Sequence, residues 1–152
     1  MTEIFKLPEK ELDEFLRGYL VCALWSTNDE STEAGGEPLD ANYEISDLAP
    51  ATLAGCRSDC QDFMVSNRTD LLEYVKRRQA GAGYTEWECA GHDFWLTRNG
   101  HGAGFWDRGL GALGDRLSEA AKVYRDAEMY VGDSGKLYIL GLENFTETEQ
   151  QG

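Results

Sequence analysis

The side chains best suited to acid–base chemistry gather in residues 91–108, GHDFWLTRNGHGAGFWDR. This segment holds both histidines of the chain, two of its four tryptophans and two aspartates. An enzymatic interpretation uses His92 as a general base oriented by Asp107, because a carboxylate bonded to one imidazole nitrogen fixes the tautomer and raises the basicity of the other nitrogen. The competing interpretation is a structural contact at a strand end, since no Ser or Cys nucleophile lies in a recognisable motif nearby.

An Asn-Gly dipeptide at residues 99–100 sets the expected geometry of this segment. It favours a two-residue type I′ turn, which predicts a hairpin with antiparallel strands at about 86–98 and 101–107. In that register Phe94 faces Phe105, and His92 faces Asp107. The candidate residues of a hairpin site are His92, Asp93, Arg98, His101, Trp106 and Asp107.

Nothing in the sequence predicts a cofactor or a metal ion. Cys56 and Cys60 are four residues apart and could offer two zinc ligands, but no second Cys pair or His-x-x-x-His follows. Both also fall in the apolar register of a predicted helix, which favours buried structural cysteine. The glycine run at 100–104 lacks the lysine of a phosphate-binding loop. We expect no metal, no cofactor and four free thiols, at Cys22, Cys56, Cys60 and Cys89.

Hydrophobic periodicity defines the elements that must position this segment. Helices are predicted at about 8–26, from 45 or 50 to 78 with a break near 66–67, and at 115–124. Short strands at 129–131 and 136–140 flank a Gly-Asp-Ser-Gly turn and predict a second hairpin. We expect an α+β fold in which N-terminal helices pack on a small antiparallel sheet of two hairpins, with one helix between these hairpins in sequence.

A chain of 152 residues with 41% hydrophobic side chains is long enough for one packed domain. We expect this domain at 1–142, with a mobile loop at about 27–43 and a polar tail at 143–152. No stretch approaches the roughly 18 consecutive apolar residues of a membrane helix, and residues 1–10 lack the layout of a secretory signal. We therefore expect a cytoplasmic protein without membrane contact.

Acidic residues dominate the charge. The chain has 28 Asp and Glu against 14 Lys and Arg, for a formal net charge of −14, which opposes direct nucleic-acid binding. Residues 1–62 carry −10 of this charge, and residues 63–152 carry −4. Such a field attracts a basic protein surface, although acids that merely keep a chain soluble would give the same count. The candidate partner-binding acids are Asp13, Glu14, Asp29, Glu30, Asp40, Glu44 and Asp47.

Two runs in the C-terminal half carry a resemblance. AGHDFWLTRNGHGAGFWDRGLGALGDRLSEAAKVY at 90–124, followed by YVGDSGKLYI at 130–139, resembles a family of small uncharacterised proteins encoded by tailed bacteriophages and related prophages. A weaker likeness lies at 59–63. The resemblance implies no activity and transfers no catalytic residue. It implies that the protein acts in the cytoplasm of an infected bacterial host.

Charge and resemblance together give the predicted function. We expect a phage-encoded acidic protein that binds a host protein with a basic surface and inhibits a nucleic-acid-handling or defence activity, with DNA mimicry as one mode. A small hydrolase using His92 and Asp107 remains an alternative. A third hypothesis is a non-inhibitory interaction module in the phage's own replication or regulation.

Overall fold

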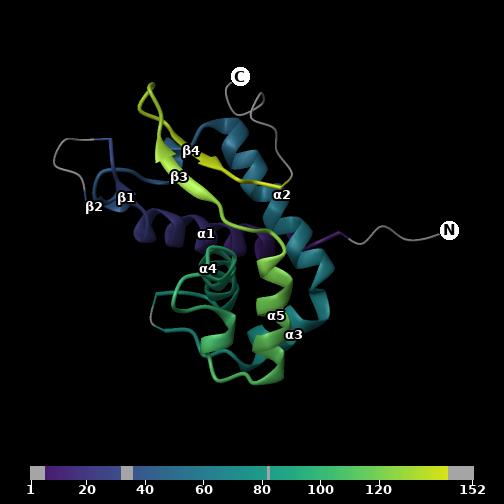
Figure 1. Cartoon of the computed structure of the whole chain (residues 1–152). Coiled ribbons are helices and arrows are strands. Elements are labelled where there is room, and N and C mark those ends of the chain that lie inside the picture. Colours follow the sequence, from purple (N-terminus) through teal and green to yellow (C-terminus); the bar gives the residue numbers. More distant parts are fainter. Residues whose placement is uncertain (1–5, 32–35, 82, 144–152) are drawn as a thin grey trace.

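Helices and two short hairpins form the computed structural model, which describes residues 6–31, 36–81 and 83–143 (Figure 1). The α-helices of this part of the chain are α1 (Glu9–Ser26), α2 (Pro50–Ser66), α3 (Arg68–Arg77), α4 (Glu86–Arg98) and α5 (Ala112–Lys122). Strands β1 (Asn28–Asp29) and β2 (Glu37–Pro38) pair antiparallel, as do β3 (Glu128–Val131) and β4 (Leu137–Leu140). Three 3-10 turns complete it: η1 (Leu39–Ala41), η2 (Ile45–Asp47) and η3 (Phe105–Asp107). The predicted α+β class is confirmed.

Helix α1 packs against α4 through a contact between their backbones. A Cβ atom added at Gly18 of α1 would lie 2.0 Å from the carbonyl oxygen of Glu88, and one added at Gly91 of α4 would lie 1.9 Å from that of Phe15. Only glycine allows so close an approach. The β3–β4 hairpin and the helices α4 and α5 lie on opposite sides of α1 (Figure 1).

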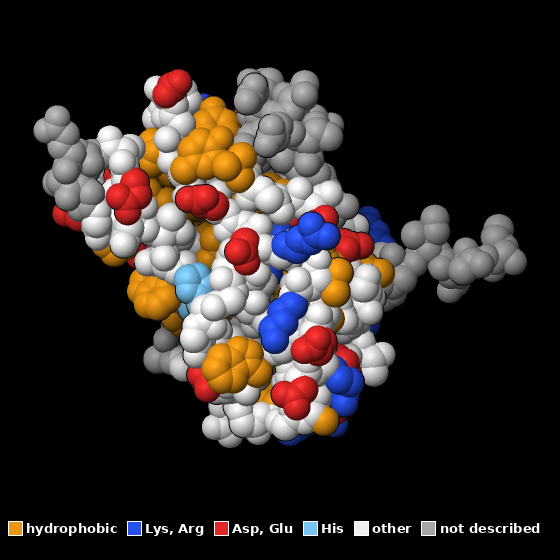
Figure 2. Space-filling model, viewed as in Figure 1, with side chains coloured by type: hydrophobic (Ala, Val, Ile, Leu, Met, Phe, Trp, Pro, Cys, Tyr) orange, Lys and Arg blue, Asp and Glu red, His pale blue; other side chains and the backbone are white. Residues whose placement is uncertain are grey.

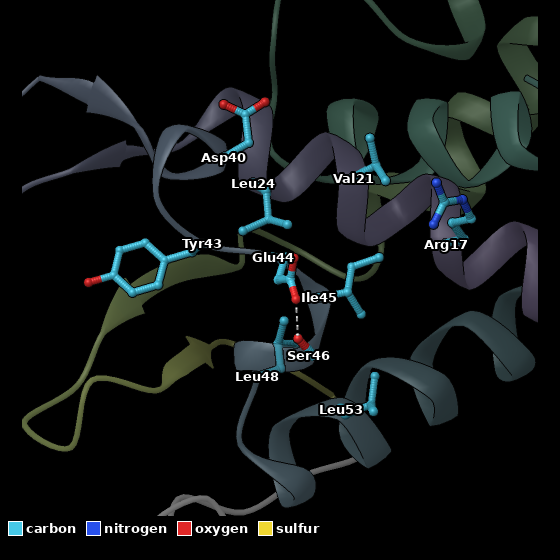
Figure 3. A pocket seen from close by; sticks show the side chains of 10 residues that line it. All are labelled: Arg17, Val21, Leu24, Asp40, Tyr43, Glu44, Ile45, Ser46, Leu48 and Leu53. Carbon is cyan, nitrogen blue, oxygen red and sulfur yellow. Dashed lines mark hydrogen bonds between the residues drawn. The ribbon is translucent and has the colours of Figure 1, made fainter. Parts of the chain in front are cut away.

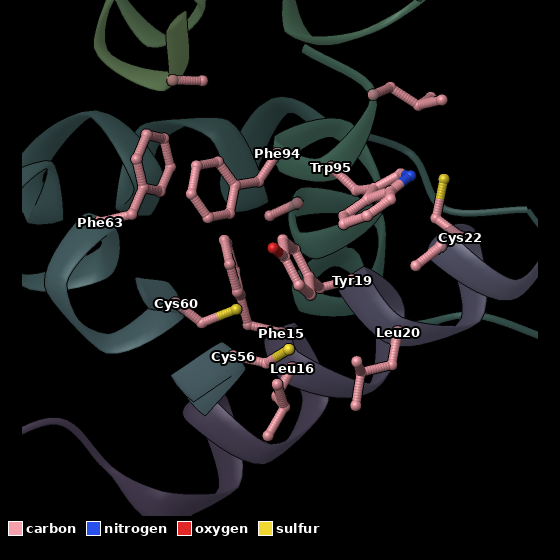
Figure 4. Close-up of a cluster of buried hydrophobic side chains, with 14 of the residues drawn as sticks. Phe15, Leu16, Tyr19, Leu20, Cys22, Cys56, Cys60, Phe63, Phe94 and Trp95 are labelled. Atoms are coloured by element: carbon pink, nitrogen blue, oxygen red, sulfur yellow. The ribbon is translucent and has the colours of Figure 1, made fainter. Parts of the chain in front are cut away.

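Aromatic rings from several helices fill the core between α1, α2 and α4 (Figure 4). Phe63 and Phe94 stack at 4.2 Å between ring centroids, and Tyr19 meets Trp95 edge to face at 5.1 Å. Such pairs stabilise a core by about 0.5–1.5 kcal/mol beyond the area they bury. Phe105 extends from η3 into the same cluster, with its ring centroid 5.9 Å from that of Phe63.

A fully buried arginine joins the elements around this core. Arg98, the last residue of α4, has a side chain with 0% exposure and forms an ion pair of 3.0 Å with Asp59 of α2, which is equally buried. A guanidinium has five N–H donors, and Arg98 makes five hydrogen bonds. Their acceptors are the carboxylate of Asp59, the hydroxyl of Tyr19 and the carbonyls of Tyr124, Arg125 and Gly141.

The predicted hairpin at 86–107 is wrong, because residues 86–98 form helix α4. Thr85 caps this helix with a reciprocal box in which its hydroxyl accepts from the Glu88 amide while the Glu88 carboxylate accepts from the Thr85 amide. The Asn-Gly dipeptide ends the helix instead of turning a hairpin. Gly100 has φ of +66°, the left-handed conformation common just after a helix.

Most of the other elements predicted from the sequence are confirmed. Helices at 8–26, at 50–78 with a break at Asn67, and at 115–124 are confirmed as α1, α2 with α3, and α5, and the hairpin at 129–140 is confirmed as β3–β4. The expected loop at 27–43 contains the β1–β2 pair and η1. Of the predicted polar tail only Glu143 lies within the described residues. None of the described helices combines the length and apolar character needed to cross a membrane.

Loss of the buried ion pair tests the role of Arg98. We expect Arg98→Met to lower the free energy of unfolding by about 3–5 kcal/mol, because Asp59 would stay buried without its cation. The double variant Arg98→Met/Asp59→Leu should be less destabilised than the two single changes together. Urea unfolding of the four proteins measures this. Arg116→Met, which removes an exposed pair with Asp70, is the control and should change little; additive effects of the two core changes would contradict the coupling.

The close backbone contact between α1 and α4 leads to a second prediction. Gly91→Ala should destabilise the protein by about 3 kcal/mol, because the new methyl group overlaps backbone atoms that cannot move aside independently. The matched control is Gly102→Ala, where an added Cβ meets open space; it should stay within about 0.5 kcal/mol of wild type. Chemical unfolding monitored by circular dichroism gives both values. Equal midpoints for the two variants would refute the close helix contact.

Candidate partner-binding site

A long stretch of the chain contains acids and no bases. Between Arg17 and Arg57 there is no Lys or Arg. The same stretch has seven acidic residues: Asp29, Glu30, Glu33, Glu37, Asp40, Glu44 and Asp47. All but Glu33 lie in the described part of the chain. In the view of Figure 2, most Lys and Arg side chains lie toward α5. The end of the molecule that contains the β1–β2 and β3–β4 pairs shows acidic side chains and little basic charge. We call residues 28–31 and 36–48 the acidic segment.

Backbone hydrogen bonds fix the acidic segment to the helices and to β4. The amide of Leu39, a residue only 1% exposed, donates to the Thr27 carbonyl at the end of α1 over 2.8 Å. The amide of Tyr43 then donates to the Leu39 carbonyl at 2.9 Å. Just beyond the segment, the amide of Ala49 donates to the Leu137 carbonyl at 3.0 Å. The acids between these points therefore project from an anchored backbone.

Two acids, Glu44 before η2 and Asp47 within it, also cap this turn. The Glu44 amide donates to the Asp47 carboxylate at 2.8 Å, and the Glu44 carboxylate accepts from the Ser46 hydroxyl at 2.7 Å. The first bond satisfies the backbone amide of Glu44 at the start of η2, and the second joins two side chains. They hold both carboxylates in defined positions without neutralising their charge.

An apolar groove of about 620 Å³ runs between α1 and the acidic segment (Figure 3). Its wall on α1 consists of Arg17, Val21 and Leu24, which follow one another at helical spacing. The opposite wall comes from the acidic segment and the first turn of α2: Asp40, Tyr43, Glu44, Ile45, Ser46, Leu48 and Leu53. Figure 3 shows Asp40 toward one end and Arg17 toward the other. The groove is therefore lined mainly by apolar side chains, with Asp40 toward one end and Glu44 with Ser46 near its middle.

Two of the predicted acids already have basic partners. Asp13 accepts from Arg57 at 3.0 Å, and Glu14 pairs with Lys10 at 2.5 Å. The Lys10 hydrogen bond lowers the pKa of Glu14 and keeps it ionised. At one end of the groove, Arg17 pairs with Glu88 at 3.1 Å. The acids of α1 are thus largely balanced within the molecule.

Asp29 is also engaged internally. It is 6% exposed, and its carboxylate accepts from the hydroxyl and the amide of Ser31, which lowers the pKa of Asp29. The remaining four predicted acids differ, because in the part of the chain that the structure describes no Lys or Arg forms an ion pair with them. They are Glu30, Asp40, Glu44 and Asp47.

The apolar half of the site was not predicted from the sequence. Val21 and Leu24 lie outside the apolar stripe that the sequence predicts for α1, and that departure was the available signal. The predicted stripe comprises Leu12, Phe15, Leu16, Tyr19 and Ala23. Leu53 belongs to the apolar stripe predicted for the long helix, and Ile45 lies at the earlier of its two predicted starts, so neither residue was expected at a surface groove. The sequence therefore predicted the charge at this site but not the groove.

The structure does not assemble the proposed hydrolytic pair. His92 lies half-buried on α4 between two exposed rings, at 6.2 Å from Trp25 and 6.3 Å from Tyr84 between centroids. Asp107 lies in η3, and no hydrogen bond between described residues joins it to His92. The pairing followed from the hairpin register, which α4 replaces.

The other residues of the expected hairpin site are dispersed. Asp93 is buried, where it accepts from the Tyr74 hydroxyl at 2.6 Å and from Arg108 at 2.6 Å. Arg98 belongs to the core network described above. The last three residues, His101, Trp106 and Asp107, lie exposed beyond the end of α4. Asp93 and Arg98 are therefore structural, and of the candidate residues His92 and Asp93 line a common cavity of about 190 Å³ together with Arg108.

Cysteine and metal chemistry find no support in the described residues. All four cysteines are free thiols, and burial raises the pKa of Cys22 to about 12. Burial likewise raises the pKa of Cys56 and Cys60, whose side chains lie among core aromatic residues (Figure 4). A buried neutral thiol is a poor nucleophile. No group of three or more His, Cys, Asp or Glu suited to a metal ion occurs in the residues that the structure describes.

No protein-family model, curated protein or solved structure matches the chain. Its function is therefore inferred from its own geometry and charge, and the likeness to phage proteins stays a prediction.

The environment of His92 predicts a pH effect on stability. Burial lowers the pKa of His92 below its ordinary value of 6.5. Between the folded and unfolded pKa values the unfolded chain binds more protons, so the free energy of unfolding should fall as pH drops through this window. Urea unfolding at about pH 7 and about pH 5 measures the loss. His92→Gln should reduce this loss of unfolding free energy, and the exposed control His101→Gln should not. A loss in His92→Gln equal to that of wild type would contradict the contribution of His92 to the pH effect.

Proposed function

We propose that this protein is a phage-encoded, non-catalytic binding protein that uses its acidic segment to engage a basic surface of a host protein. One observation carries the proposal. Glu30, Asp40, Glu44 and Asp47 lie in a stretch without a single Lys or Arg, and the backbone that carries the last three is anchored at Leu39 and Ala49. An acidic surface that served solubility alone would need neither the anchoring nor the local exclusion of bases.

Electrostatics indicates what such a surface does. Acids without a basic partner in the described chain keep their field toward solvent, whereas Asp13 and Glu14, paired with Arg57 and Lys10, have much of theirs cancelled. A field of this kind accelerates encounter with a basic partner by about 10- to 1,000-fold and is screened over about 8 Å at physiological salt. Association rate, more than residence time, should therefore depend on these carboxylates.

The partner is a nucleic-acid-handling or defence protein, whose activity this protein inhibits. Such proteins present basic surfaces for phosphates, and a net charge of −14 suits competition for them. DNA mimicry is the strongest form of this idea. The rival hydrolase is not supported by a specific observation, because His92 and Asp107 have no hydrogen bond to each other.

Charge reversal within the acidic segment tests the proposal. The variant Asp40→Lys/Glu44→Lys should lose about tenfold in association rate with a host protein captured from bacterial lysate. The control Glu73→Lys/Glu119→Lys changes the net charge equally at exposed positions of α3 and α5 and should bind as wild type does. Wild-type association should also slow as salt rises from about 0.05 to about 0.5 M. Equal rates for all three proteins, indifferent to salt, would overturn the proposal.

A further inference from the structure

Resting on the proposed function, we infer that the groove beside the acidic segment binds the apolar face of a short amphipathic helix of the partner, with Lys or Arg next to that face. The observation behind it is that a mainly apolar groove also includes Asp40 and Glu44, which have no basic partner among the described residues. A surface for electrostatic attraction alone would not require the groove.

The groove offers apolar contact area at the right positions. Leu24 and Leu48 are 4% and 5% exposed and belong to the core, while Val21, Ile45 and Leu53 are only half-buried. The half-buried side chains come from three different elements and converge on one channel (Figure 3). Covering them would remove apolar surface from water, which stabilises a complex by roughly 25 cal/mol per Å² before the costs of association.

The length of the groove fits a helix of about two turns. Arg17 and Leu24 are seven helical steps apart on α1, with Val21 between them, which is about 10 Å along its axis. A bound helix of that length presents three apolar anchors at positions i, i+3 or i+4, and i+7. The bound helix forms its backbone hydrogen bonds within itself, so the apolar walls of the groove need not supply hydrogen bonds. Its side chains can then pack against α1 as one helix packs against another.

The charged side chains around the groove favour certain sequences in the bound helix. Asp40 and Glu44 line the groove without a basic partner in the described chain, so a Lys or Arg flanking the apolar anchors would find carboxylates within reach. At the other end Arg17, although paired with Glu88, repels further cations. Basic residues should therefore concentrate at one end of the bound helix. A second copy of this chain is disfavoured as occupant, because two surfaces with this excess of acids repel each other.

Peptide selection identifies the occupant directly. A library of random 14-residue peptides is selected on the purified full chain, and the enriched peptides are measured by fluorescence anisotropy. Apolar residues at helical spacing together with two or more Lys or Arg should be enriched. Val21→Gln and Ile45→Gln should each weaken the best peptide by about tenfold. The control Val65→Gln, an exposed valine of α2 outside the groove, should stay within about twofold.

Each pattern of results separates this inference from the proposed function. If Asp40→Lys/Glu44→Lys weakens the peptides and the groove variants do not, the acidic binding protein stands and the groove inference fails. If groove variants matter and charge reversal does not, the proposed electrostatic function fails. Failure to enrich any peptide, or enrichment of peptides without the apolar spacing, would overturn the groove inference. Thermal unfolding of each variant confirms that it is folded.

Discussion

The buried guanidinium of Arg98 is the interaction on which the rest of the structure depends. It ends α4 and bonds to α1 through Tyr19, to α2 through Asp59, and to the backbone that follows α5 and β4. A charge in this position is costly unless every donor is satisfied, so the five acceptors must assemble together. The network favours one arrangement of the helices and the β3–β4 hairpin. Asp59 extends it by accepting the amide of Glu143.

Most of the fold could be predicted from local sequence, and the largest error has a physical cause. Helical spacing identified α1, α2, α3 and α5, because each has an apolar face against the core. Helix α4 is buried over most of its surface, from Gly91 to the charged Arg98, so its apolar residues show no helical period. The Thr85 and Glu88 capping box was the signal that could have corrected the hairpin. Gly100 adopts the positive φ that both interpretations require.

The candidate site was predictable only in its charge. Counting acids identified the N-terminal half, but composition cannot distinguish Asp13, which Arg57 neutralises, from Asp40, which has no basic partner in the described chain. That distinction depends on contacts between α1 and α2. The groove likewise exists only because the acidic segment folds back beside Val21. Its backbone is held by the Leu39 amide, in a region whose composition predicted a loop.

The central claim is that the acidic segment is a preformed surface and not a flexible acidic loop. Hydrogen exchange of the folded protein, measured residue by residue by NMR, tests it most directly. The amides of Leu39, Tyr43 and Ala49 are hydrogen-bonded, so they should exchange as slowly as amides in the middle of α1. Exchange of these three amides at the rate of an unstructured peptide, while α1 stays protected, would contradict the claim.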